Sequence, residues 1–160
     1  MSNLIGFQQH LLEQINDLTI KGEDDLYLRF QLNNTNYLVD CDNILYVMRN
    51  SFILPVPNAP IYIKGITEHN GSVYTCYDLK YLMINELQEI TPRHKILILQ
   101  QDFYQGISFL VENVLSIATK NDFKVIHEFD SESLIKKHLE YKSDNSEWNL
   151  IDFRNLNILK

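Results

Sequence analysis

Residues 61–79 read IYIKGITEHNGSVYTCYDL, and this stretch decides the fold class. Asn70-Gly71 separates two runs rich in apolar and β-branched residues, and both residues tolerate the positive φ of a two-residue type I′ turn. The stretch therefore predicts two antiparallel strands joined at Asn70-Gly71. Asp78 directly follows the second strand, in the position of an N-cap, and so predicts a short helix that begins at Leu79.

The chain upstream of this hairpin predicts further short strands. Residues 52–60 contain three prolines, which cannot donate to a sheet ladder, so we expect an extended connector there. Apolar and polar residues alternate over 26–32, which is typical of a half-buried strand. A turn at 33–36 leads to a second strand over 37–41, and Asp42 is then expected to cap a short helix that carries Ile44, Val47 and Met48 on one side.

The N-terminal segment has a different period. Its apolar residues recur at spacings of three and four, which predicts one face of an amphipathic helix: Leu4, Phe7, Leu11, Leu12, Ile15 and Leu18. We therefore expect residues 1–24 to form an N-terminal helix outside the main fold, and residues 25–160 to form the main domain.

The second half of the chain repeats the plan of the first. Strands are expected over 95–100, 106–111 and 148–151, with a helical turn over 112–117 and a polar, ambiguous segment over 119–147. Two pairs of segments also echo each other in the same order. Residues 42–47 parallel 112–117, and residues 77–82 parallel 151–156, where Asp152 is expected to cap a turn as Asp78 does. The echoes predict a mostly-β chain made of two similar subdomains of about five strands each.

Composition excludes several classes of protein. The 160 residues carry a formal charge of −7, which argues against nucleic acid and against a polybasic membrane patch. The two cysteines lie far apart, the N-terminus does not resemble a signal peptide, and no apolar run is long enough to span a bilayer. We therefore expect a cytoplasmic protein.

No group of residues has the pattern of a catalytic, cofactor or metal site. The five histidines are scattered and none has metal-ligand spacing: His10, His69, His94, His127 and His138. Cys41 and Cys76 lie in strand patterns and are expected to be small core residues. Asp78 and Asp152 are better explained as caps than as a catalytic carboxylate pair. We therefore predict a non-enzymatic protein with no catalytic residue, no cofactor and no metal, which acts by binding other proteins.

An ordered set of motifs resembles the CheW-like domain family over residues 26–160. The set consists of the proline-bearing connector 55–60, the strand 63–67 that contains Gly65, the hairpin at Gly71, the Asp78-Leu79 pair and the segment 106–114. The resemblance implies two intertwined SH3-like five-stranded β-barrels with short helices. It also implies an adaptor that couples a chemoreceptor-type coiled-coil tip to the CheW-like regulatory domain of a histidine kinase.

The resemblance also implies a partner-binding surface, and the sequence departs from the family pattern at three positions. Asn70 stands where an arginine is usual, Tyr46 stands where a glutamate is frequent, and Glu112 replaces the usual aspartate of its segment. An N-terminal helical extension is similar to CheW-like proteins of type IV pilus (twitching) signalling systems. The candidate partner-binding residues are Ile44, Tyr46, Val47, Met48, Ile66, Glu68, His69, Asn70 and Gly71.

Two other interpretations remain open from the sequence. A degenerate adaptor could cap or inhibit a signalling array without joining receptor to kinase, and the replacements at Tyr46 and Asn70 motivate this alternative. A small-ligand-binding β-barrel or an enzyme would instead need a deep polar pocket with clustered titratable groups.

Overall fold

The computed structural model describes residues 10–17, 25–50, 53–102 and 104–156. Short strands dominate this part of the chain, and their connections are turns and short helices. In chain order the elements are β1 (Leu26–Leu32), β2 (Thr35–Asp40), η1 (Cys41–Asn43), β3 (Ile44–Arg49), β4 (Ile63–His69), β5 (Ser72–Asp78), α2 (Leu79–Ile84), β6 (Lys95–Leu99), β7 (Ile107–Val111), β8 (Asn113–Thr119), η3 (Lys120–Asp122), β9 (Phe123–Glu128), β10 (Ile135–Tyr141), β11 (Glu147–Ile151) and η4 (Phe153–Asn155).

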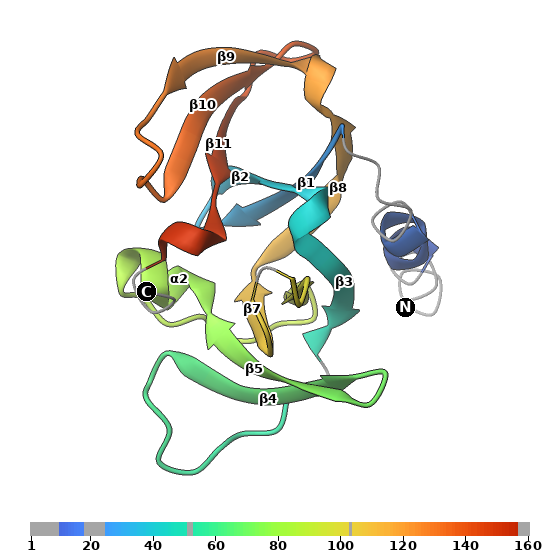
Figure 1. The fold of residues 1–160 in the computed structure, drawn as a ribbon, viewed down its shortest axis with the longest axis vertical. Coiled ribbons are helices and arrows are strands. Elements are labelled where there is room, and N and C mark those ends of the chain that lie inside the picture. The colour runs from blue at the N-terminus through green and yellow to red at the C-terminus, as the bar shows by residue number, and fades with distance from the viewer. Residues whose placement is uncertain (1–9, 18–24, 51–52, 103, 157–160) are drawn as a thin grey trace.

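The strands form two sheets (Figure 1). One is six-stranded in the order β8-β1-β2-β11-β10-β9, and the other is five-stranded in the order β3-β6-β7-β5-β4. Neighbouring strands are antiparallel except for two parallel pairs, β2 with β11 and β5 with β7. The prediction of a mostly-β chain with two β-subdomains is thereby confirmed, with six and five strands in place of five each.

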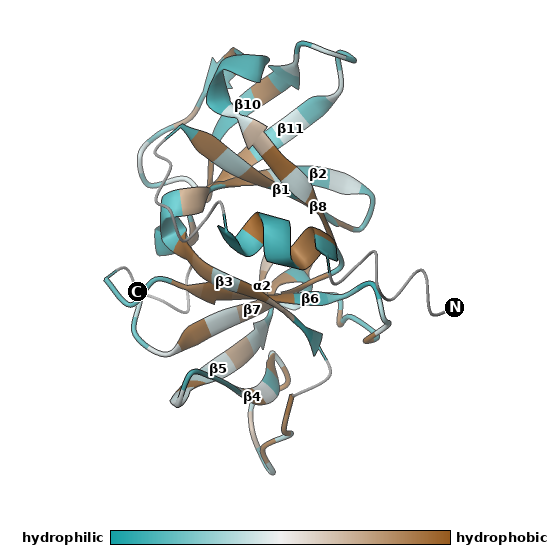
Figure 2. Ribbon diagram, turned by 90° about the vertical axis from the view of Figure 1, so that its right-hand side faces the viewer, coloured by the Kyte–Doolittle hydropathy of each residue, from teal (hydrophilic) through white to brown (hydrophobic). Residues whose placement is uncertain are grey.

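The largest core cluster lies between the two sheets. Strand β1 alternates, so Leu28, Phe30 and Leu32 enter this central cluster while Tyr27 faces a second cluster within the six-stranded sheet. All five residues of β6 are buried, because apolar side chains cover both faces of the five-stranded sheet. Figure 2 shows the apolar strands β3, β6 and β7, which are neighbours in this sheet, near the middle of the molecule. Burial of both faces joins the two subdomains into one packed unit.

Two expected helical segments are strands, and one irregularity explains both errors. Residues 44–49 form β3, which pairs with β6, and the register shifts between Ile44 and Tyr46. The bulge places Ile44 and Val47 on one face at a spacing of three, which mimics a helical period. Asp42 lies inside the short 3₁₀ turn η1 and does not cap it. The prediction of a helix here was therefore wrong.

The segment over 112–117 repeats the same feature. Strand β8 pairs with β1, and its register passes from Ser116 directly to Val114, so Leu115 is the bulged residue. Val114 and Ile117 consequently share a face that packs on the central cluster. The sequence echo between the two segments is real, and it marks two bulged strands in place of two helical turns. The ambiguous segment that follows forms η3, β9 and β10.

The described part of the N-terminal segment, residues 10–17, is helical. Leu12 and Ile15 belong to the central cluster, and Asn16 is buried against Val47 of β3. The expectation that this helix lies outside the main fold was therefore wrong, because its apolar face covers part of β3. The remaining residues of 1–24 lie outside the described residues.

Candidate functional site

Strand β3 divides its side chains between the core and the surface. Ile44 and Val47 are almost fully buried in the central cluster. Tyr46 and Met48 point to the other side, where they pack at the margin of a smaller cluster that includes Tyr74. The bulge at Leu45 produces this division, so the half-buried Tyr46 and Met48 are available at the surface.

The β4–β5 hairpin brings its tip beside β3. Asn70 and Gly71 have φ values of 51° and 82°, as a type I′ turn requires, and they connect the paired residues His69 and Ser72. The His69 ring stacks on Tyr46, with centroids 4.1 Å apart and planes inclined by 25°. This contact holds the hairpin tip against β3. Burial lowers the pKa of His69, so the ring is neutral near pH 7 and stacks without carrying a charge.

A groove of about 450 Å³ lies between β3, the hairpin tip and the helix over 10–17. We call it the partner groove. Its walls combine carboxylates, a guanidinium, an aromatic stack and apolar side chains, which suits a protein surface better than a small polar substrate. It is lined by Leu12, Glu13, Tyr46, Val47, Met48, Arg49, Glu68, His69 and Asn70.

Six of the nine candidate partner-binding residues line the partner groove: Tyr46, Val47, Met48, Glu68, His69 and Asn70. Three do not. Ile44 is 0% exposed and belongs to the core, so its proposed surface role is withdrawn. Ile66 exchanges two backbone hydrogen bonds with Leu54 in the proline-bearing connector, and Gly71 is exposed outside the groove.

Three groove residues were missed from the sequence: Leu12, Glu13 and Arg49. The apolar period of the N-terminal segment predicted a helix, but nothing in the sequence showed where that helix docks. Arg49 ends β3 and its position in the groove follows from the correction of this segment from helix to strand.

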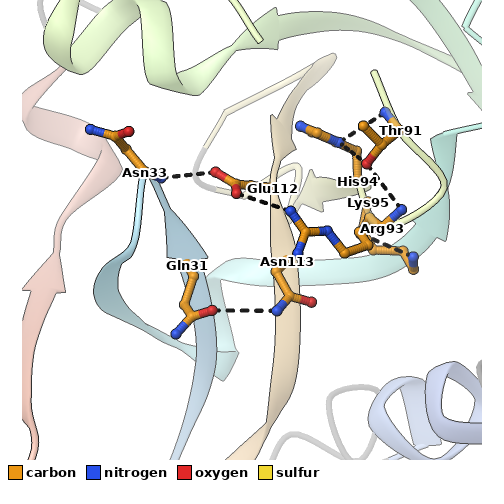
Figure 3. Close-up of polar contacts among 8 residues, drawn as sticks. All are labelled: Gln31, Asn33, Thr91, Arg93, His94, Lys95, Glu112 and Asn113. Atoms are coloured by element: carbon orange, nitrogen blue, oxygen red, sulfur yellow. Dashed lines mark hydrogen bonds and ion pairs between the residues drawn. The ribbon is translucent and has the colours of Figure 1, made fainter. Parts of the chain in front are cut away.

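Glu112 has a structural role, which Figure 3 shows. Its carboxylate accepts the backbone N–H of Asn33 in the β1–β2 turn at 2.9 Å and a guanidinium N–H of Arg93 at 3.3 Å. The adjacent Asn113 donates to the Gln31 side chain on β1 at 3.4 Å. The longer glutamate that replaces the family's aspartate therefore ties a turn of the six-stranded sheet to the segment before β6.

The two aspartates of the second echo are caps, as predicted. Asp78 accepts the N–H of Tyr81 at 3.1 Å at the start of α2, and Asp152 accepts the N–H of Arg154 at 3.0 Å at η4. Asp152 also forms an ion pair with Arg154 at 2.8 Å, which together with the hydrogen bonds lowers the pKa of the carboxyl against the opposing effect of burial. The two carboxylates act at separate element ends and form no catalytic pair.

The described residues offer little for covalent or metal chemistry. Burial raises the pKa of both Cys41 and Cys76 to about 12, so neither thiol ionises near pH 7. Within the described ranges no cluster of three or more His, Cys, Asp or Glu side chains could hold a metal ion. The same part of the chain contains no helix long and apolar enough to cross a membrane.

Comparison with known proteins adds three findings. A family model described as "CheW-like domain" matches residues 26–140. Protein FrzA of Myxococcus xanthus is 29% identical over 69 residues, which span 43% of this chain and 43% of that relative. The crystal structure of the scaffolding protein TtCheW from Thermoanaerobacter tengcongensis is similar with a TM-score of 0.64 at 18% identity, over 81% of this chain and 90% of that one. At 18% identity this structural similarity shows a shared fold and nothing further.

Proposed function

The chain belongs to the CheW-like domain family, and from this premise we propose that it is an adaptor that couples a chemoreceptor-type sensor to a histidine kinase. The CheW-like domain is a scaffold and adaptor module with no enzymatic activity of its own, so the chain is assigned to a non-enzymatic class. TtCheW, which shares its fold, is described as a scaffolding protein. The proposed partners are the CheW-like regulatory domain of the kinase and the coiled-coil tip of the receptor.

The observation that carries the proposal is the partner groove. Two segments far apart in the sequence, β3 and the tip of the β4–β5 hairpin, meet there with surface-accessible Tyr46, Met48 and Glu68. Aromatic and methionine side chains at the centre, with charged side chains around them, are the usual composition of a protein–protein interface. We assign this groove to the kinase domain, with a total buried area on the order of 1,000–2,000 Å².

A charge reversal tests this assignment. Glu68 is exposed and lines the groove, so Glu68→Arg should weaken binding of the kinase's CheW-like domain by at least about tenfold, because a like charge or an unpaired arginine would face the partner. Isothermal titration calorimetry measures the affinity. Glu132→Arg is the matched control, since Glu132 is also an exposed glutamate but lies in the turn before β10. Equal affinity of the two variants would remove the hairpin from the interface.

A second candidate function is a cap or inhibitor of a signalling array. The observation in its favour is that Tyr46 and Asn70, where the family pattern has a glutamate and an arginine, present no charge to a partner. An array cap would lower kinase activity when added to receptor and kinase, whereas an adaptor would raise it. An increase in kinase autophosphorylation therefore rejects the cap.

The N-terminal helix adds a finer assignment to the adaptor proposal. A helical extension before the CheW-like domain is similar to adaptors of type IV pilus systems, so we assign the output to twitching motility. Deletion of the gene should abolish twitching and leave flagellar swimming unchanged. The opposite result would place the adaptor in a flagellar pathway.

A further inference from the structure

The outer edge of β3 is covered by the N-terminal helix. Strand β3 stands at the end of the five-stranded sheet, where β6 is its sheet neighbour on one side. The helix over 10–17 lies beside the opposite edge of β3 (Figure 1). The Asn16 carboxamide oxygen accepts the N–H of Val47 at 2.7 Å, and its nitrogen donates to the Val47 carbonyl at 2.9 Å. Asn16 is only 4% exposed, so both bonds are shielded from water.

This pair of bonds copies the pattern of a β-ladder. In a hydrogen-bonded antiparallel pair, a residue exchanges its N–H and its C=O with one partner residue. Here the side-chain amide of Asn16 stands in for the peptide groups of an absent strand. Leu12 and Ile15 take the place of the apolar side chains of such a strand, because they bury apolar surface in the same cluster as Ile44 and Val47. An open edge strand has unpaired backbone N–H and C=O groups that can bind a strand of another chain. Covering the edge is one way in which proteins control such pairing.

We propose that the outer edge of β3 is a strand-accepting surface that residues 10–17 cover. An extended apolar segment of the kinase domain displaces residues 10–17 and pairs with this edge as an added strand. The inference rests on the proposed function, because the masked edge and the partner groove are continuous through Val47. Displacement would remove the groove wall that Leu12 and Glu13 form, and it would leave the walls from β3 and the hairpin tip for the same partner. The incoming segment would place apolar side chains where Leu12 and Ile15 lie, and peptide groups where the Asn16 amide lies.

The two arrangements differ in the number of hydrogen bonds that β3 makes at this edge. One carboxamide engages the backbone groups of Val47, whereas an added strand forms a ladder along several residues of β3. The helix is nevertheless held in place by Leu12 and Ile15, so the free chain keeps its edge covered. Because mask and partner compete, the measured affinity is reduced by the fraction of molecules in which the edge is open.

Substitution of Asn16 separates the mask from the partner. Asn16→Leu keeps the size of the side chain and removes both hydrogen bonds to Val47, so exchange of the Val47 amide should accelerate at least about tenfold. The exchange is measured by NMR relative to the amide of Leu97 on β6, which reports global unfolding. The dissociation constant for the kinase's CheW-like domain should fall several-fold. Gln14→Leu is the matched control, because Gln14 is an exposed amide on the same helix and should change neither quantity.

Each other outcome overturns part of the inference. Unchanged relative exchange at Val47 would show that Asn16 does not hold the edge, and faster exchange with unchanged or weaker kinase binding would show that this partner does not use it. A dimer of Asn16→Leu in light scattering, with unaltered kinase affinity, would assign the edge to a second copy of the chain. If neither the wild type nor the variants bind the kinase domain, the proposed function fails together with the partner assignment, and the exchange data alone then decide whether the mask exists.

Discussion

Replacement of the Asp78 carboxylate by an amide should destabilise the protein strongly. Asp78 is fully buried, and its two oxygens accept the N–H of Tyr81 at 3.1 Å and the backbone and side-chain N–H groups of Gln88 at 2.8 and 2.7 Å. Lys64 lies 3.4 Å away as a counter-charge. In Asp78→Asn an NH₂ group replaces one of the two oxygens. It must then face either the N–H of Tyr81 and the side-chain N–H of Gln88, or the backbone N–H of Gln88 and the Lys64 ammonium. Each hydrogen bond to a charged acceptor contributes about 1.5–3 kcal/mol, so we expect a loss of about 3–5 kcal/mol in the free energy of unfolding.

Urea denaturation measures this loss. The unfolding of the wild type and of Asp78→Asn is followed by circular dichroism and by the fluorescence of Trp148, which is buried in the second core cluster. Asp130→Asn is the control, since Asp130 is an exposed acid and its substitution should cost less than about 0.5 kcal/mol. A loss below about 1 kcal/mol for Asp78→Asn would refute the reasoning, because it would mean that the buried carboxylate contributes no more than a neutral amide.

Two further predictions concern the connector and the segment before β6. A Cβ atom added at Gly65, where φ is +149°, would lie 2.3 Å from the Leu54 carbonyl oxygen. Gly65→Ala should therefore lower the free energy of unfolding by about 2–4 kcal/mol, measured by urea denaturation, and make the connector more sensitive to proteolysis. Unchanged stability would show that the connector shifts freely. Burial lowers the pKa of His94 below its ordinary value of 6.5, and its Nδ1 accepts the N–H of Thr91 at 3.0 Å. Protonation is therefore less favourable in the folded state, and the free energy of unfolding should fall as the pH drops below about 6.5, by up to about 1.4 kcal/mol for each unit by which the pKa is lowered. His94→Asn keeps an acceptor and removes the titration, so its stability should vary less between pH 7 and 5; an unchanged pH profile would contradict this role.

The sequence identified local features whose causes are local. Asn70-Gly71 forms the predicted turn because few other residues adopt positive φ at two successive positions, and both values are observed. Asp78 and Asp152 cap their elements because a carboxylate that follows a strand can accept the first free N–H groups. The order of these features along the chain was sufficient to indicate the family, which the match over residues 26–140 establishes.

Prediction from the sequence was wrong where pairing with a distant strand produces the spacing of apolar residues. Ile44 and Val47 are three residues apart, and only the pairing of β3 with β6 shows that a bulge, and not a helix, produces this spacing. A sequence also does not show which face of a strand is covered. Ile44 therefore was assigned to a partner surface, although it is fully buried.

By itself, then, the sequence determined the β-rich class, the turns, the caps and the duplicated plan, because these depend on residues that are neighbours along the chain. Only the tertiary structure decided that Glu13 and Glu68 line one groove, and that Asn16 covers the edge of β3. The helix over 10–17 and strand β3 meet because burial of Leu12 and Ile15 is favourable only against the apolar surface that the assembled sheets provide. That surface does not exist until distant segments have folded together, so no local pattern could reveal where the helix docks.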